Sequence, residues 1–362
     1  MKLYLLDKYI IKKFLSTFFF SILLIVCIAV IFDFAEKVDD FIDKHAPFKA
    51  IIFDYYLNFV PYFAVLFMPL FTFISVIFFT SKMAYNTEII AILSSGISYA
   101  RMLRPYIISA LIIAIFSFIM NNFIIPGSTK KMLDFEEKYY RNAPPSFNYI
   151  NFHRQISPGI IIYMETYDNR SNYGRKFSIE KYQNGKLISK LFAEEIFWNQ
   201  EKHKWQVRDY YIRNYISEDK QEIITGVSLD TTINMYPEDF KQRENIIQAM
   251  SWKELNRYIQ ILKMQGTSNI EYALIEKYRR LSVPFSTFIL TIIGVCVSSR
   301  KVRGGIGLHI GLGLLLSFSY IFFMQFSTQF SLKGDLDPLI AMWIPNFIYI
   351  PIAYILYRTT PK

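Results

Sequence analysis

The sequence has little of what enzymes and disulfide-bonded secreted proteins need. Its only two cysteines, Cys27 and Cys296, fall inside long apolar stretches, so the polar central region has no disulfide framework. Its four histidines are scattered, without H-E-x-x-H or paired Cys/His spacing, which argues against a metal site. A G-x-x-x-x-G-K-[ST] phosphate loop is also missing, so we expect no ATP hydrolysis by this chain alone. The sequence therefore predicts no catalytic residue and no cofactor.

Acidic residues are absent from the middle of every long apolar stretch. Ion-coupled transporters carry ionisable groups at that depth, so their absence argues against a secondary transporter. Hydrophobic residues make up 52% of the chain, which is more than a water-soluble surface carries. Stretches of about 20 apolar residues can cross a bilayer. Six such stretches are predicted: 14–32, 55–80, 105–125, 281–299, 306–330 and 339–357.

The net charge of +10 is distributed by membrane side. One set of connections and both chain ends carry twelve lysines and arginines against two acids, Asp7 and Glu88. The opposite short loops, at about 33–54 and 331–338, carry four lysines against eight acids. Because basic residues favour the cytoplasmic side, we expect both termini in the cytoplasm. The charge then reflects membrane topology, and we expect no nucleic-acid partner.

The large gap between the third and fourth apolar stretches, 126–280, is expected to be exported. Short β-type runs fill about 147–234, and Asn184-Gly185 is a strong hairpin signal between two of them. We predict a polytopic α-helical membrane protein with six transmembrane helices, three on each side of a periplasmic antiparallel β-domain of jellyroll-like type. The expected domains are a first transmembrane half, the periplasmic domain with two connecting helices, and a second transmembrane half, at 1–125, 126–280 and 281–362.

The cytoplasmic loop 81–104 is unusual. Its segment 87–93 is a short amphipathic helix that carries Glu88, the only acid in the cytoplasmic connections between spans. Gly96 follows, where a glycine can adopt the positive φ that ends a helix. A carboxylate on such a helix suits docking into a basic groove of a partner. Alternatively, Glu88 only complements its own helix dipole, worth about 0.3–1 kcal/mol, and the residues alone do not decide between the two.

Several segments, in this order along the chain, resemble one family. They are LDKYIIKKFLSTF in the first helix, NTEIIAILSSGIS in the cytoplasmic loop, the Asn-rich exit from the third span at 121–126, and SWKELNRYIQILKMQG through LSVPFSTFILTIIGVCVSSRKVRGG. With the three-helix, β-domain, three-helix plan, nearly the whole chain resembles the LptF/LptG permeases of the lipopolysaccharide-export ABC transporter.

This resemblance implies a mechanism and partners in the Gram-negative inner membrane. Two such permeases would pair above an LptB-like dimer of cytoplasmic ATPases, extract lipopolysaccharide and pass it through a β-domain to an LptC/LptA-like periplasmic bridge protein, for outer-membrane biogenesis. Glu88 matches the glutamate of the family's coupling helix, and Pro284 and Gly294 match packing positions. The residues expected to couple to the ATPase are Thr87, Glu88, Ala91, Ile92, Ser95 and Gly96.

The chain departs from the family near the outer end of its first helix. Better-known G-type members have a basic residue where this chain has Asp33, so a phosphate contact at that position is not expected. Other basic residues near the outer face are candidates for contacting lipid phosphates. Each has the alternative role of anchoring the helix at the interface. These candidates are Lys37, Lys130, Lys131, Lys277, Arg279 and Arg280.

Two other classes of function remain open from the sequence. The chain could be an envelope scaffold that anchors a trans-periplasmic assembly by adding a strand to the edge of its β-domain. A membrane enzyme acting on lipid is a third class, although no nucleophile, base or metal cluster supports it. Nucleotide-driven movement of lipid would distinguish the transport subunit from the scaffold.

Overall fold

The computed structural model describes residues 4–139, 148–217, 220–233, 235–237, 244–265, 270–299 and 305–360. The chain divides into two compact units. A helical unit takes Met1–Tyr140, Ile247–Trp252 and Glu271–Lys362, and a β-rich unit takes Arg141–Ile246 and Lys253–Ile270. The helix that follows the third span and residues 271–280 belong to the helical unit.

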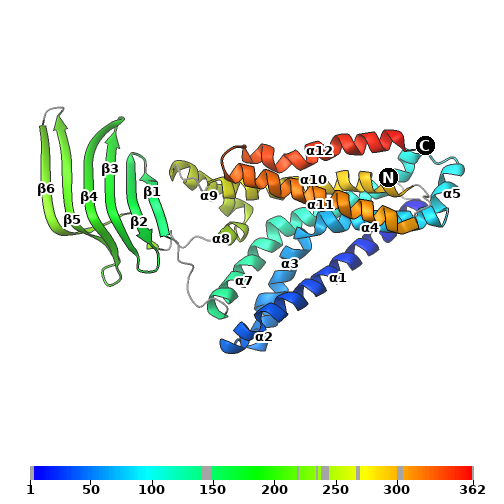
Figure 1. Cartoon of the computed structure of the whole chain (residues 1–362), viewed down its shortest axis with the longest axis horizontal. Coiled ribbons are helices and arrows are strands. Elements are labelled where there is room, and N and C mark those ends of the chain that lie inside the picture. The colour runs from blue at the N-terminus through cyan, green and yellow to red at the C-terminus, as the bar shows by residue number, and fades with distance from the viewer. Residues whose placement is uncertain are drawn as a thin grey trace. The chain divides into compact units, whose positions relative to one another are not determined.

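Long helices dominate the helical unit (Figure 1). Six helices of the described residues are long and apolar enough to cross a membrane, and each of the six predicted spans overlaps one of them. The second predicted span, 55–80, begins before its membrane-length helix, Met68–Tyr85, because a helix break at Phe67 interrupts the apolar run. The chain is therefore a multi-pass membrane protein. Its elements are α1 (Leu5–Asp43), α2 (Phe48–Ala50), η1 (Ile51–Tyr56), α3 (Leu57–Leu66), α4 (Met68–Tyr85), α5 (Glu88–Ser94), α6 (Tyr99–Ile119), η2 (Met120–Ile124), α7 (Ile125–Tyr139), α10 (Ile270–Ser298), α11 (Gly305–Leu332) and α12 (Pro338–Thr359).

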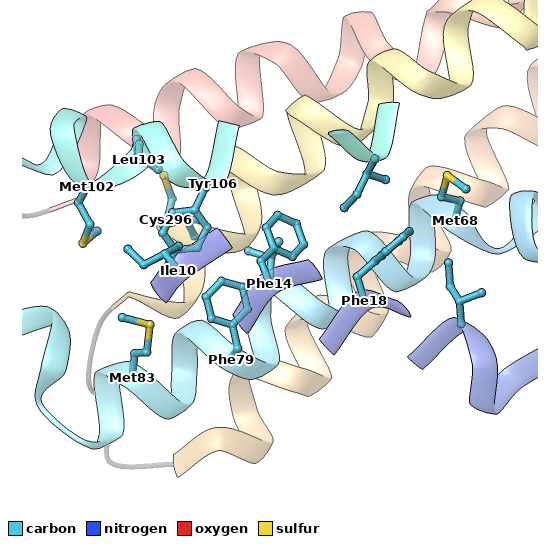
Figure 2. Close-up of a cluster of buried hydrophobic side chains, with 14 of the residues drawn as sticks. Ile10, Phe14, Phe18, Met68, Phe79, Met83, Met102, Leu103, Tyr106 and Cys296 are labelled. Atoms are coloured by element: carbon cyan, nitrogen blue, oxygen red, sulfur yellow. The ribbon is translucent and has the colours of Figure 1, made fainter. Parts of the chain in front are cut away.

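One stripe of α1 forms the centre of the largest core cluster. Residues at every fourth position are buried, which places them on one face of the helix: Ile10, Phe14, Phe18, Ile22 and Val26. On the other face, Leu23 and Leu24 are 63% and 48% exposed. Figure 2 shows Phe14 of α1 beside Phe79 of α4 and Tyr106 of α6. The rings of Phe79 and Tyr106 stack on each other, with their centroids 5.3 Å apart. Because α1 buries only this stripe, its remaining apolar surface is available to lipid or to another chain.

Two short π-helical turns, η1 and η2, interrupt the helices near one end of the unit, and asparagines follow or occupy them. A π-turn leaves backbone carbonyls without their usual amide partners. In η2, the amides of Asn121 and Asn122 donate to the carbonyls of Ser117 and Phe118 at 3.0 and 2.9 Å. After η1, Asn58 donates to the carbonyls of Phe53 and Asp54. The asparagines therefore satisfy carbonyls that lipid cannot.

Glycines let two neighbouring helices pack closely against α4. A Cβ added at Gly294 of α10 would lie 2.8 Å from Val76 Cγ1. A Cβ at Gly313 of α11 would collide with the side chain of Ile77, the next residue of α4. Because α4 is approached through glycine by both helices, Gly294 acts as a packing position, as the family resemblance implied.

The β-rich unit contains one six-stranded antiparallel sheet in sequence order. Asn184 and Gly185 have φ of 52° and 78° and form the predicted hairpin turn between two strands. Trp205 is fully buried among the side chains of one sheet face and donates from its indole N–H to the Met235 carbonyl at 2.7 Å. The antiparallel β-domain is confirmed, and its described strands are joined as a meander. The strands are β1 (Asn148–Ser157), β2 (Ile160–Asp168), β3 (Tyr173–Gln183), β4 (Lys186–Asn199), β5 (Lys204–Ser217) and β6 (Lys220–Thr231), followed by α8 (Glu244–Gln248) and α9 (Trp252–Gln265).

Candidate functional site

The candidate site is built on α5, at the end of the helical unit where α1 begins and α12 ends (Figure 1). We call this the α5 end, and the end that carries α2 and the turn between α11 and α12 the opposite end. α5 is only seven residues long and links α4 to α6. A helix this short is unstable by itself, so its position depends on what holds its two termini and its inner side.

Both termini of α5 are shaped by residues with positive φ. Thr87 precedes the helix with φ of 61°, a conformation that is unfavourable for a β-branched residue. Gly96 follows the helix with φ of 85°, where glycine carries no such penalty. Ser98 then caps α6 by accepting a hydrogen bond from the Arg101 amide at 3.3 Å. These turns fix the direction of α5 relative to α4 and α6.

The inner side of α5 is anchored in the helical core. Ile89 is 1% exposed and belongs to the same cluster as the α1 stripe, and Ile92 and Leu93 pack against that cluster. The outer face is left free of the bundle, and Ile90 on it is 55% exposed. Exposed residues at helical spacing form this face: Thr87, Ile90, Ala91, Ser94 and Ser95. We refer to these five residues as the α5 outer face.

Glu88 is half-buried at the first turn of α5 and is held by neutral donors. The Tyr9 hydroxyl of α1 donates to one carboxylate oxygen at 2.7 Å. The Asn86 amide lies 3.3 Å from the other oxygen. Glu88 makes no ion pair with any residue that the structure describes. Its carboxylate is therefore positioned by Tyr9 and Asn86, and no described residue neutralises its charge.

The other acid at this end, Asp7, is used inside the chain. Arg101 of α6 donates to both carboxylate oxygens of Asp7, at 2.7 and 2.8 Å, and the Tyr4 amide adds a third hydrogen bond at 3.0 Å. Asp7 is 2% exposed. This two-pronged pair joins the start of α1 to the start of α6. Sequence reasoning counted Asp7 only as a charge, because its partner is 94 residues away.

The predicted coupling residues do not all lie on one face. Thr87, Ala91, Ser95 and Gly96 are exposed, whereas Ile92 turns toward the core. Sequence reasoning missed Ile90 and Ser94, which share the outer face. The signal was present, because positions 87, 90, 91, 94 and 95 follow the three- and four-residue spacing of one helix face.

A family model describes this chain almost from end to end. The model of the lipopolysaccharide export system permease LptF/LptG matches residues 8–359. The chain belongs to the LptF/LptG family. The resemblance found in the sequence is thereby confirmed, and with it the assignment to transport and lipopolysaccharide export. No curated protein matches the chain at a significant level.

At the opposite end, this LptF/LptG chain uses Asp33 to hold a neighbouring cation. Lys37 forms an ion pair with Asp33 at 2.7 Å and also contacts the Tyr55 hydroxyl. The hydroxyls of Tyr55 and Tyr56 lie 3.3 and 3.2 Å from the Asp33 carboxylate. Lys37, a lipid-headgroup candidate, is thus engaged by its own helix and by η1. Asp33 thus has a structural role at this end of the helical unit.

Arg280, another candidate, is buried inside the LptF/LptG fold. It is 1% exposed and pairs with Glu276, four residues earlier, at 2.9 Å. Its guanidinium also donates to the Met250 carbonyl at 2.9 Å, with the Gln248 carbonyl at 3.3 Å. Arg280 therefore fastens the segment 247–250 to α10. Arg279 shares Glu276 at 2.6 Å but keeps a third of its side chain exposed.

The remaining headgroup candidates differ in exposure. Lys130 and Lys131 of α7 are exposed, and neither has an ion-pair partner among the described residues. The Lys277 ammonium lies 5.7 Å from the Trp252 ring centroid, a cation–π distance. Of the six candidates, the two lysines of α7 are thus the most available to a ligand.

Proposed function

We propose that this chain is a permease subunit of an ABC exporter that extracts lipopolysaccharide from the inner membrane and passes it through its periplasmic β-domain. A single observation carries the proposal: a short helix anchored in the bundle through Ile89 holds a carboxylate, Glu88, beside an exposed outer face, and no described residue forms an ion pair with it. A partner's basic groove supplies the chemistry that this arrangement lacks. The chain itself is non-catalytic, and a separate LptB-like ATPase dimer supplies the energy.

Movement of the ATPase reaches the membrane through α5. The helix is seven residues long and is bounded by the turns at Thr87 and Gly96. A displacement of α5 by the ATPase therefore also displaces α4 and α6. Ile89 transmits the same displacement to the α1 stripe. The bundle then closes on a lipid that has entered from the side.

The second permease of the pair packs against the least buried spans. In α1 and α11, 22% of the most apolar 18-residue stretch is buried, against 72% in α10. On α11, Gly307 and Gly311 are spaced four residues apart, and a Cβ added at either would meet nothing within 4 Å. This small-residue spacing favours close packing of another helix. These features support a two-permease assembly, whether of identical or different chains.

The β-domain offers chemistry suited to acyl chains and to a bridge protein. One face of its sheet is lined by apolar side chains, with Ile162, Met164 and Phe177 fully buried. Its last described strand, β6, pairs only with β5, and Val227 on it is 77% exposed. Such an edge accepts a further strand, as an LptC/LptA-like bridge would provide. The scaffold alternative uses the same edge, so only nucleotide-driven release of lipid separates the two functions.

The test compares the wild-type chain with Glu88→Ala and Glu88→Lys at equal membrane levels. Truncating one partner of a buried charge pair costs about 2–5 kcal/mol, and reversing its sign costs more. We expect Glu88→Ala to reduce co-purification of the ATPase or ATP-driven lipopolysaccharide release, and Glu88→Lys to abolish them. If all three chains assemble and release lipid alike, the coupling role of Glu88 is disproved.

A matched pair of isoleucines tests the outer face of α5 independently. Ile90 of α5 and Ile112 of α6 are 55% and 40% exposed. Ile90→Ala should weaken association with the ATPase, because it removes an apolar anchor from the proposed interface. Ile112→Ala lies on the membrane-facing surface of α6 and should leave association unchanged. Equal behaviour of the two variants would contradict docking through α5.

A further inference from the structure

An apolar groove runs between α6, α10 and α12, apart from the α5 outer face. It has a volume of about 390 Å³, and its lining side chains are isoleucine, leucine, alanine and tyrosine. α6 contributes Ala100, Leu103 and Ile107, and α12 contributes Ile350 and Tyr354 among others. None of the lining residues is charged. A ligand that fills this groove must therefore be apolar along its length.

The groove begins at the α5 end and runs into one leaflet. Ala100 lies in the first turn of α6, and Tyr357 lies in the last turn of α12. The lining stretch of α6, 100–107, rises by about 10 Å at 1.5 Å per residue. Half of the hydrocarbon core of a bilayer is about 15 Å thick. The groove thus follows most of the depth of the leaflet at the α5 end.

Two exposed arginines, Arg104 and Arg358, lie on the same helices as the apolar lining and next to it in sequence. Arg104 lies four residues after Ala100 and three before Ile107, so it shares their face of α6. Arg358 lies four residues after Tyr354, and its guanidinium is 5.9 Å from the Tyr354 ring centroid. Neither arginine has an ion-pair partner among the described residues. Two positive charges, on Arg104 and Arg358, therefore lie next to an uncharged apolar groove.

We propose that this groove binds an acyl chain of an anionic glycerophospholipid from the leaflet at the α5 end, with Arg104 and Arg358 holding its phosphate. Basic residues between transmembrane helices bind such headgroups on the cytoplasmic side of membranes. The bound lipid fills the space between α6, α10 and α12, which also contact one another directly through Tyr99. This role is distinct from transport, because the lipid is a resident and not the exported cargo.

The lining of the groove favours a lipid chain over a helix of another protein. Helices associate in membranes through glycine, alanine and serine, which let the backbones approach. Here only Ala100 and Ala353 are small, and the other lining residues have large side chains. Charge complementarity points the same way, because the two arginines match a phosphate and an apolar transmembrane helix offers them no anion.

Native mass spectrometry of the full-length permease, alone and with its assembly partners, tests the proposal. The probes are phosphatidylglycerol and phosphatidylcholine with identical acyl chains, titrated after removal of co-purified lipid. We expect phosphatidylglycerol to bind about tenfold more tightly, and Arg104→Gln with Arg358→Gln to remove that preference. The matched control, Lys12→Gln with Lys82→Gln, changes two exposed lysines at the α5 end outside the groove and should keep the preference.

A second pair of variants tests the groove itself. Ile107→Trp fills it and should reduce binding of both phospholipids, whereas Ile115→Trp, on the same helix outside the groove, should not. The proposal is overturned if the wild type binds both lipids equally, if the arginine variant keeps its preference, or if Ile107→Trp binds like the wild type. Displacement of phosphatidylglycerol by lipopolysaccharide would assign the groove to the cargo. Loss of the lipid when the second permease assembles would assign it to a protein interface, and either result refutes the proposal.

Discussion

The two ends of the helical unit treat their charges differently. At the opposite end, two of the six cations expected to meet lipid are satisfied by the chain itself: Lys37 by Asp33, and Arg280 by Glu276 and backbone carbonyls. At the α5 end, Asp7 is satisfied by Arg101, whereas Glu88 has only two neutral donors, Tyr9 and Asn86, among the described residues. Each end therefore combines a structural ion pair with a charge left for a partner.

This difference shows why the charge pattern alone misleads. A basic residue at a membrane boundary can anchor its helix at the interface, stabilise the fold through an internal ion pair, or bind a lipid phosphate. Its charge is positive in all three cases. Burial and hydrogen-bond partners separate these roles, because a guanidinium that already satisfies a carboxylate and two carbonyls has little left to offer a phosphate. The following predictions test that separation.

The largest effect is expected for Arg280→Met. Breaking a buried ion pair by removing one partner costs about 3–5 kcal/mol, because Glu276 is left buried and charged. We expect a large fall in the melting temperature of the purified chain. Adding Glu276→Gln should recover part of the loss but not the hydrogen bonds to Met250 and Gln248. Arg279→Met, on a half-exposed side chain, is the control and should cost much less.

At the α5 end, Asp7→Asn should cost about 1–3 kcal/mol, because the Arg101 guanidinium loses its anion at a buried position. The effect is smaller than for Arg280, since the Arg101 side chain is 26% exposed and water can replace part of the interaction. Lys8→Gln, at the exposed neighbouring position, should be neutral. Equal melting temperatures for Asp7→Asn and the wild type would mean that the pair does not hold α1 to α6.

The sequence predicts the parts of the fold that depend on local signals. Apolar length alone predicts the six spans, and Asn184-Gly185 predicts a hairpin because both residues tolerate positive φ. The break between α3 and α4 at Phe67 was not predicted, because the apolar run continues through it. The π-turns were also missed, since asparagine repairs carbonyls that only the folded helix exposes.

The candidate site divides in the same way. Glu88 could be singled out because it is a lone acid among basic residues, which the sequence displays directly. The helical spacing groups Ile90 with Thr87, Ala91 and Ser94, but which face of α5 packs on the core becomes clear only from the folded structure. The Glu276–Arg280 pair has readable four-residue spacing, but the carbonyls that complete the site of Arg280 lie 30 or more residues away.

A smaller effect is expected at the turn before α5. Thr87 has positive φ, which costs an L-residue about 1–2 kcal/mol. Thr87→Gly relieves this strain but also increases the conformational entropy of the unfolded chain, so the net stabilisation should be at most about 1 kcal/mol. Gly96→Ala is the matched reversal at the other end of α5. A Cβ there meets nothing within 4 Å, so only the φ of 85° resists it, and the chain should lose about 1 kcal/mol. Thermal unfolding in one detergent measures both, and a destabilised Thr87→Gly would show that the threonine side chain makes a contact worth more than its strain.

The smallest change in stability is expected for substitution of the exposed lysines of α7. These variants compare cations without an ion pair in the described part of the chain with cations that the chain itself neutralises. Lys130→Gln with Lys131→Gln should shift the free energy of unfolding by no more than about 0.5 kcal/mol, because both side chains are exposed without ion-pair partners among the described residues. If these lysines contact lipid phosphates, the double variant should nevertheless bind lipopolysaccharide more weakly, and its binding should depend less on salt. Lys37→Gln is the contrasting variant: it should lower stability by breaking the contacts with Asp33 and Tyr55. The measurement is lipopolysaccharide binding to the purified assembly at low and high ionic strength, beside the melting temperature of each variant. Wild-type binding and salt dependence in the α7 variant would remove the last two freely exposed candidates and leave the half-exposed Arg279 as the cation to test next.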